Sequence, residues 1–199
     1  MRPVLSMLLV TFAFVGTPAA QTIGVYGDPS AATCPVIPIG PTQVYVVATL
    51  APAACGGITG AEFRLVGWPT SWFYSLQQGP GIPEIGNPFQ EGIRLTSFTC
   101  RTGEGGTVPL LTITVFAPSP ASNVTVTVNG HLQPADPQFA CPVVALCDAP
   151  VFTKLCATGI TTRINDQFGF CRCLAPCLGA CQPIGVEPSS WSSIKRLYD

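Results

Sequence analysis

The chain has 199 residues, enough for one domain, and only 10% of them are charged, well below the quarter that is typical of soluble proteins. Its formal net charge of −1 provides no basic field that would attract nucleic acid or anionic lipid. The 47% hydrophobic content allows a packed core, while the two Met, two Lys and one His argue against a helical bundle.

Residues 1–20 have the three parts of a secretory signal peptide. Arg2 gives a positive start, an apolar run of twelve residues follows at 4–15, and small residues at 16–20 allow cleavage after Ala19. Twelve residues are fewer than the ~20 that a membrane-spanning helix needs. The sequence therefore predicts a secreted or extracytoplasmic protein, in the periplasm or at the cell surface, with no membrane span in the mature chain.

From residue 21 to 169 the chain has the pattern of an all-β domain. Short segments rich in β-branched residues alternate between apolar and polar positions at 43–50, 61–65, 93–98, 111–116, 124–128, 143–147, 151–155 and 160–164. Asn129-Gly130 indicates a tight turn, after which Leu132 begins a return segment that Pro134 ends. Strands at this spacing predict a two-sheet antiparallel β-sandwich.

Ten cysteines follow the signal peptide, and an even number in an exported chain indicates disulfides whose pairing the spacing does not reveal. They are Cys34, Cys55, Cys100, Cys141, Cys147, Cys156, Cys171, Cys173, Cys177 and Cys181. The last four could instead hold zinc or an iron–sulfur cluster. Exported thiols oxidise, so we expect disulfides, with no metal and no cofactor.

Two segments follow the predicted sandwich. Residues 170–185 form a Cys-rich loop segment, and residues 186–199 predict a short C-terminal helix. The helix has an apolar stripe that must contact either the sandwich or a partner, and the pattern leaves both open. The stripe consists of Trp191, Ile194, Leu197 and Tyr198.

One aromatic group is the best candidate for a binding surface. Trp68, Trp72, Phe73 and Tyr74 lie within seven residues of one another. Such side chains either fill the core and close one end of a sandwich or, when exposed, stack on a sugar ring or a protein side chain. We expect an unidentified glycan or protein partner.

Residues for catalysis are few. His131 is the single histidine, it directly follows the predicted turn where we expect it to be exposed, and no nucleophile or metalloprotease motif accompanies it. Glu84 and Glu91 flank one loop and are the best pair of carboxylates for a glycan hydrolase, which is the alternative reading. The sequence predicts a non-enzymatic binding or structural module with no catalytic residue.

Two strand patterns resemble a known family. Gly57-Ile58-Thr59-Gly60-Ala61-Glu62-Phe63-Arg64-Leu65 and Leu111-Thr112-Ile113-Thr114-Val115-Phe116 resemble strands of cohesin-like and related immunoglobulin-like bacterial modules. From Ile23 to the C-terminal tail the chain also resembles exported proteins of environmental Gram-negative bacteria that have no established function. The resemblance implies an exported sandwich module. Cohesins bind dockerins, but the Cys-rich end of this chain departs from that family. We therefore do not infer dockerin binding from the resemblance.

Overall fold

The computed structural model of the chain describes residues 21–51, 54, 56–77, 84–119, 123–148 and 150–165. The predicted signal peptide, the Cys-rich segment and the C-terminal helix lie outside these residues, and so do Cys55 and the last four cysteines. The described residues form twelve strands and one short 3-10 turn, η2 (Glu104–Gly106). No helix of the described part is long and apolar enough to cross a membrane.

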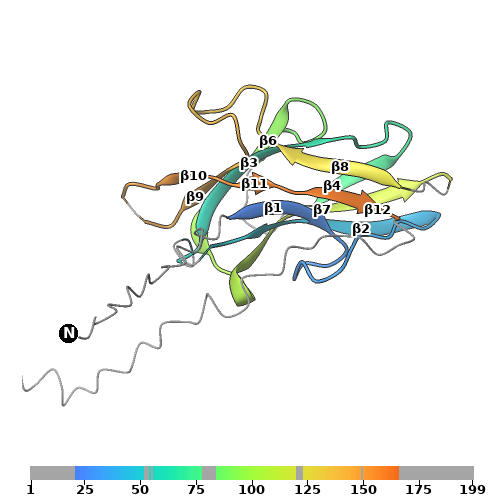
Figure 1. The fold of residues 1–199 in the computed structure, drawn as a ribbon, viewed down its shortest axis with the longest axis horizontal. Coiled ribbons are helices and arrows are strands. Elements are labelled where there is room, and N and C mark those ends of the chain that lie inside the picture. The colour runs from blue at the N-terminus through green and yellow to red at the C-terminus, as the bar shows by residue number, and fades with distance from the viewer. Residues whose placement is uncertain are drawn as a thin grey trace, which may run out of the picture.

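The first sheet has five strands in the order β11-β1-β2-β7-β4 (Figure 1). They are β1 (Thr22–Tyr26), β2 (Gly40–Thr49), β4 (Phe73–Gln77), β7 (Thr107–Ala117) and β11 (Thr158–Gly159). Neighbouring strands are antiparallel except for β1 and β11, which run parallel. The sheet therefore ends at β4 on one side and at the two-residue strand β11 on the other.

The second sheet is built around β3, with the order β10-β9-β3-β6-β5. The first part of β3 pairs with β9, and the end of β3 pairs with β8. β8 pairs in turn with β12. The strands are β3 (Ile58–Val66), β5 (Glu84–Asn87), β6 (Gly92–Arg101), β8 (Val124–Asn129), β9 (Val143–Leu146), β10 (Lys154–Cys156) and β12 (Thr161–Ile164).

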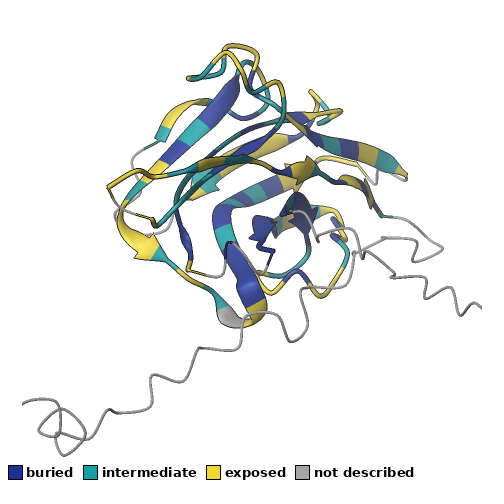
Figure 2. Ribbon diagram, turned by 60° about the vertical axis from the view of Figure 1, so that its left-hand side comes forward, coloured by how far each residue is buried: buried dark blue, intermediate teal, exposed yellow. Residues whose placement is uncertain are grey.

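The core lies between the two sheets, as the alternating pattern predicts (Figure 2). Val44 and Ile113 of the first sheet and Phe63 and Ile93 of the second are completely buried, and all four belong to one hydrophobic cluster. Their sequence neighbours point outward, because successive side chains of a strand alternate between its two faces. The predicted two-sheet sandwich is confirmed.

The predicted return after Asn129-Gly130 is wrong. β8 ends at Asn129, and the chain then runs without a strand until β9 begins at Val143. Prolines at 134, 137 and 142 lack the N–H that a ladder requires, and they prevent a hairpin strand here. A Cβ on Gly130 would lie 2.3 Å from the carbonyl oxygen of Ala140, so the loop folds back tightly onto its own start.

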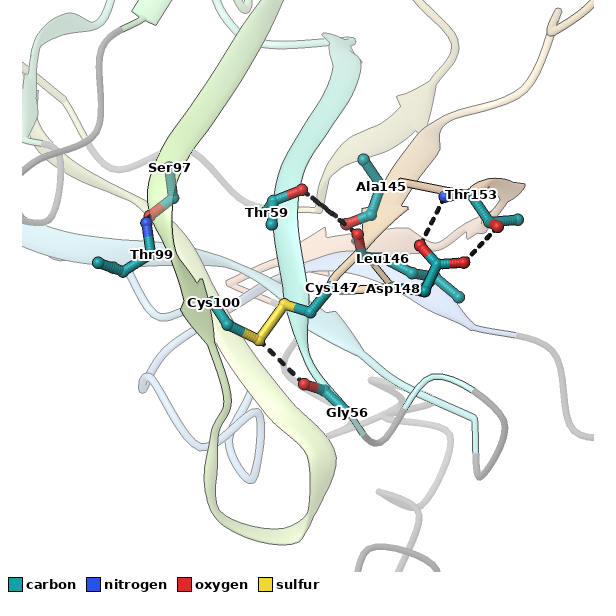
Figure 3. The surroundings of a disulfide bond; sticks show 10 residues. All are labelled: Gly56, Thr59, Ser97, Thr99, Cys100, Ala145, Leu146, Cys147, Asp148 and Thr153. Atoms are coloured by element: carbon teal, nitrogen blue, oxygen red, sulfur yellow. Dashed lines mark hydrogen bonds between the residues drawn. A yellow bond between two sulfur atoms is a disulfide. The ribbon is translucent and has the colours of Figure 1, made fainter. Parts of the chain in front are cut away.

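Two disulfides connect strands of the second sheet, which confirms the prediction for four of the cysteines. The long-loop disulfide joins Cys100 and Cys147, 47 residues apart, and the short-loop disulfide joins Cys141 and Cys156, 15 residues apart. Figure 3 shows the long-loop disulfide between the end of β6 and the residue after β9, with Cys100 Sγ 2.9 Å from the carbonyl oxygen of Gly56. Cys34 is also disulfide-bonded.

Candidate functional site

Three of the four predicted aromatic residues belong to one packed row. Trp72 is only 4% exposed and meets Trp68 edge to face, with ring centroids 5.6 Å apart. Phe89 continues the row, 4.7 Å from Trp68 and 4.3 Å from Tyr74. The row closes the end of the sandwich where the β3–β4 connection meets the β5–β6 turn, so these rings mainly stabilise the fold.

The local sequence explains how this row is held. Trp72 N donates a hydrogen bond to Pro69 O at 3.2 Å, which closes a turn just before β4. Asn87 fixes the opposite side, because its Nδ2 donates to Tyr74 Oη at 3.3 Å and its Oδ1 accepts from Phe89 N at 2.9 Å. Tyr74 keeps 41% of its surface exposed, whereas Trp72 has no free ring face to offer a ligand.

Phe73 points to the opposite side of β4 from Tyr74. It pairs in register with Phe116 of β7, the two ring centroids are 6.4 Å apart, and Phe116 is in turn paired with Pro41 of β2. Phe73 is 69% exposed and Phe116 is 44% exposed. A row of apolar side chains therefore crosses three strands on the outer surface of the first sheet.

The surface around this row is uncharged, and we call it the Phe73 face. The next outward residues in register are Gln43, Thr114 and Ser75, followed by Thr112 and Gln77. The Phe73 face consists of Pro41, Gln43, Phe73, Ser75, Gln77, Thr112, Thr114 and Phe116. It ends at β4, whose five residues contain neither a charge nor a proline.

The other half of this outer surface is covered by the loop that follows β1. Tyr26, Ala31 and Val47 form a small buried cluster beneath that loop. Asp28 holds the loop by accepting hydrogen bonds from Ser30 and Thr33, and although burial raises its pKa, these bonds lower it to about 2. Among the described residues, none is placed over the half formed by β2, β7 and β4 in this way.

Glu84 and Glu91 lie at different places on the β5–β6 hairpin. Glu84 pairs in register with Leu95, while Glu91 directly precedes Gly92 at the turn end. Glu91 is four residues from Leu95, about 14 Å at ~3.4 Å per residue, which exceeds the spacing of glycosidase carboxylates. Glu91 Oε1 also accepts a hydrogen bond from Asn87 N at 3.0 Å. The hairpin geometry does not favour this pair for catalysis.

His131 is 9% exposed, and the expectation of an exposed turn residue is wrong. Its ring lies over Gly92, where a Cβ would come within 2.5 Å of His131 Cδ2, and its Nδ1 accepts a hydrogen bond from Gln133 N at 3.0 Å. Burial, with the neighbouring Arg94, lowers its pKa. Within the described ranges, no three His, Cys, Asp or Glu residues are grouped as metal ligands would be.

Solved structures that are similar to this chain include cohesin modules. They include a non-cellulosomal cohesin from the archaeon Archaeoglobus fulgidus, 14% identical over 73% of this chain and 91% of that one, with a TM-score of 0.43. The seventh ScaB type I cohesin from Pseudobacteroides cellulosolvens is 14% identical over 74% of this chain and 92% of that one, with a TM-score of 0.47. The sixth cohesin of scaffoldin B from Acetivibrio cellulolyticus, solved with a dockerin, is 13% identical over 75% and 100%, with a TM-score of 0.47.

No family model matches the chain. No curated protein matches it either. The similarity is thus to a cohesin-like β-sandwich, at low sequence identity, as the patterns of two predicted strands indicate.

Proposed function

We propose that this chain is a non-catalytic, exported β-sandwich module that binds a partner protein through the Phe73 face. The observation that carries the proposal is the exposed pair of Phe73 and Phe116 on an uncharged surface beside an edge strand. Exposed apolar patches with a polar rim are typical of interaction sites. Aromatic side chains often supply most of the binding energy of such sites.

The Phe73 face is suited to binding because its aromatic rings are already held in place. Phe73 and Phe116 sit opposite each other on paired strands and contact each other, so each ring restricts the other. Fixing a side chain at an interface costs about 0.5–1.5 kcal/mol, and this cost is reduced when the side chain is already ordered.

The edge strand β4 favours a protein over a glycan as the partner. An edge strand presents unpaired main-chain N–H and C=O groups along one side, and natural proteins often protect such strands with charges or prolines. β4 has neither, so a partner strand can extend the first sheet while its side chains contact Phe73. A glycan has no main chain that could use this edge, and stacking on Phe73 would be its chief contact.

Export and disulfide stabilisation complete the proposal. Disulfides persist in oxidising compartments and are rare in the cytosol of most organisms. The two pairs seen in the second sheet agree with the predicted signal peptide and support a location outside the cytoplasm.

A glycan hydrolase is the second candidate function, and one observation supports it. Glu84 Oε2 is buried and has no hydrogen-bond partner among the described residues, whereas most buried polar atoms in proteins have one. Turnover of a glycan by purified protein, abolished by Glu84→Gln and by Glu91→Gln, would establish this alternative. Absence of turnover across a broad glycan panel would argue against the hydrolase and favour the proposed binding module.

The proposal is tested by photo-crosslinking followed by direct measurement of affinity. A photoreactive amino acid replaces Ser75 in the exported protein, the crosslinked protein is identified, and the purified pair is studied by calorimetry. We expect Phe73→Asp and Phe116→Asp each to weaken binding by about tenfold or more, since hot-spot side chains contribute ~2 kcal/mol. The matched control is Phe98→Asp, because Phe98 is 87% exposed but lies on β6 of the other sheet.

Three outcomes would contradict the proposal. Unchanged affinity of both Phe73→Asp and Phe116→Asp would exclude the Phe73 face. Loss of affinity only in Phe98→Asp would place the interface on the second sheet. Saturable binding of a glycan that Phe73→Asp abolishes, with no protein crosslinked, would identify the wrong class of partner.

A further inference from the structure

One cation of the second sheet, Arg64, has no ion-pair partner among the residues that the structure describes. Arg64 of β3 points outward between the completely buried Phe63 and the 1% exposed Leu65. Its Nε is buried and has no hydrogen-bond acceptor among the described residues. A buried donor of a charged group that lacks an acceptor is destabilising by about 1–3 kcal/mol or more, so its presence calls for an explanation.

The carboxylate closest to Arg64 along the strand is already engaged. Glu62 lies two residues earlier on the same face of β3, but its Oε2 lies 3.4 Å from Arg94 Nε of β6. Its two oxygens also accept hydrogen bonds from Ala135 N, at 3.0 and 3.3 Å. Glu62 therefore holds the 130–142 loop and Arg94, and Arg64 has no ion-pair partner in the described part of the chain.

Arg64 lines an open hollow of about 580 Å³ between β3, β8 and the 130–142 loop. None of the described residues that line it is Asp or Glu. Asn129 lies directly opposite Arg64 in the register of β8 and β3, so its amide shares the face of the sheet with the guanidinium. The other walls are largely apolar and include Phe139, Pro142 and Ala157.

The walls of the hollow are rigid before any ligand arrives. The short-loop disulfide joins Cys141, at the end of the loop, to Cys156 of β10, and Ala157 N donates a hydrogen bond to Pro142 O at 2.7 Å. The prolines of the loop restrict its backbone further. The walls are therefore already ordered in the folded protein, so a ligand does not lose binding free energy by ordering them.

We propose that this hollow, which we call the Arg64 site, binds a small molecule that carries a carboxylate on a compact apolar group. A guanidinium and a carboxylate match as two parallel hydrogen bonds, and Asn129 can donate a third. The apolar walls then cover the body of the ligand. The Arg64 site lies on the sheet opposite the Phe73 face, so it does not depend on the function proposed above.

Benzoate is a suitable probe, because it places a carboxylate on a small apolar ring, and benzamide is its uncharged counterpart. Both are titrated into the full mature protein, labelled with ¹⁵N, and backbone amide shifts are followed by NMR. We expect saturable shifts at Arg64, Asn129 and His131 with benzoate, and at least about tenfold weaker binding of benzamide, as loss of a charge-assisted pair implies.

Variants identify the guanidinium as the responsible group. Arg64→Gln is expected to weaken benzoate binding at least about tenfold, and Arg64→Lys to weaken it less, because a lysine keeps the charge but loses the planar pair of donors. Arg101→Gln removes a cation at the end of β6 and serves as the matched control, with binding unchanged. A cooperative urea transition shows that each variant is folded.

Several results would overturn the proposal. Equal binding of benzamide and benzoate would show that the charge is not recognised. Equal binding of inorganic sulfate would show a general anion site without the apolar contact. Full affinity in Arg64→Gln, or no saturation by about 10 mM benzoate in the unaltered protein, would remove the Arg64 site altogether.

Discussion

Trp72 and Phe73 are neighbours in sequence, and the structure predicts opposite outcomes when each is replaced by alanine. Trp72 is 4% exposed, and burying 150–250 Å² at ~25 cal/mol/Å² is worth about 4–6 kcal/mol. Substitutions of this kind in protein cores cost about 3–5 kcal/mol. Phe73 is 69% exposed, so about a third of the ~1.5–3 kcal/mol of a buried ring is lost, or about 0.5–1 kcal/mol.

Urea unfolding followed by far-UV circular dichroism measures this difference without depending on tryptophan emission. With a slope of about 2 kcal/mol/M, Trp72→Ala should lower the midpoint by about 2 M and Phe73→Ala by less than about 0.5 M. Phe98→Ala is the control for loss of an exposed ring and should behave like Phe73→Ala. A shift for Phe73→Ala as large as that for Trp72→Ala would mean that Phe73 is covered in solution, and the Phe73 face would not exist as described.

Three further predictions concern stability. Replacing both cysteines of the long-loop disulfide should lower the free energy of unfolding by about 4 kcal/mol, and replacing those of the short-loop disulfide should lower it by about 3 kcal/mol, because the longer loop restricts the unfolded chain more. A larger fall of the urea midpoint on loss of the short-loop disulfide would contradict this. Gly130→Ala should destabilise by about 2 kcal/mol or more, because its Cβ would lie 2.3 Å from a carbonyl oxygen, whereas Gly56→Ala meets nothing within 4 Å and should be near neutral in the same assay. The Asp28 carboxyl, with its pKa of about 2 against 3.8 unperturbed, stabilises the fold above pH 4 and loses this effect as the pH falls through 2, so the stability difference from Asp28→Asn should vanish there.

The sequence predicted the sandwich because its long strands alternate strictly. The residues of β7 and β8 place valine, isoleucine and leucine on one face and threonine on the other, and this pattern alone requires a two-sided sheet. Edge strands were harder to recognise. β4 has four exposed residues out of five and β11 has only two residues, so neither has a buried side long enough to give a period of two.

The site was predicted only in part, for a similar reason. A run of aromatic residues shows that rings gather, but which ring points into the core depends on the register of β4 with β7. Phe116 was not selected, although the alternation in its strand already placed it with Thr112 and Thr114 on the outer surface. Glu62 and Arg64 do share the outer face of β3, yet Glu62 pairs with Arg94 of another strand, which spacing within one strand cannot reveal.

The parallel pairing of β1 with β11 imposes an order on folding. Thr158 N donates to Gln21 O and Ile160 N donates to Ile23 O, so one edge of β1 has no partner strand until residues near 160 have been synthesised. Contacts between such distant segments form slowly, and bare strand edges are prone to pair with other chains in the meantime. A newly synthesised molecule of this protein therefore has a period before β11 forms in which the edge of β1 can pair with other chains.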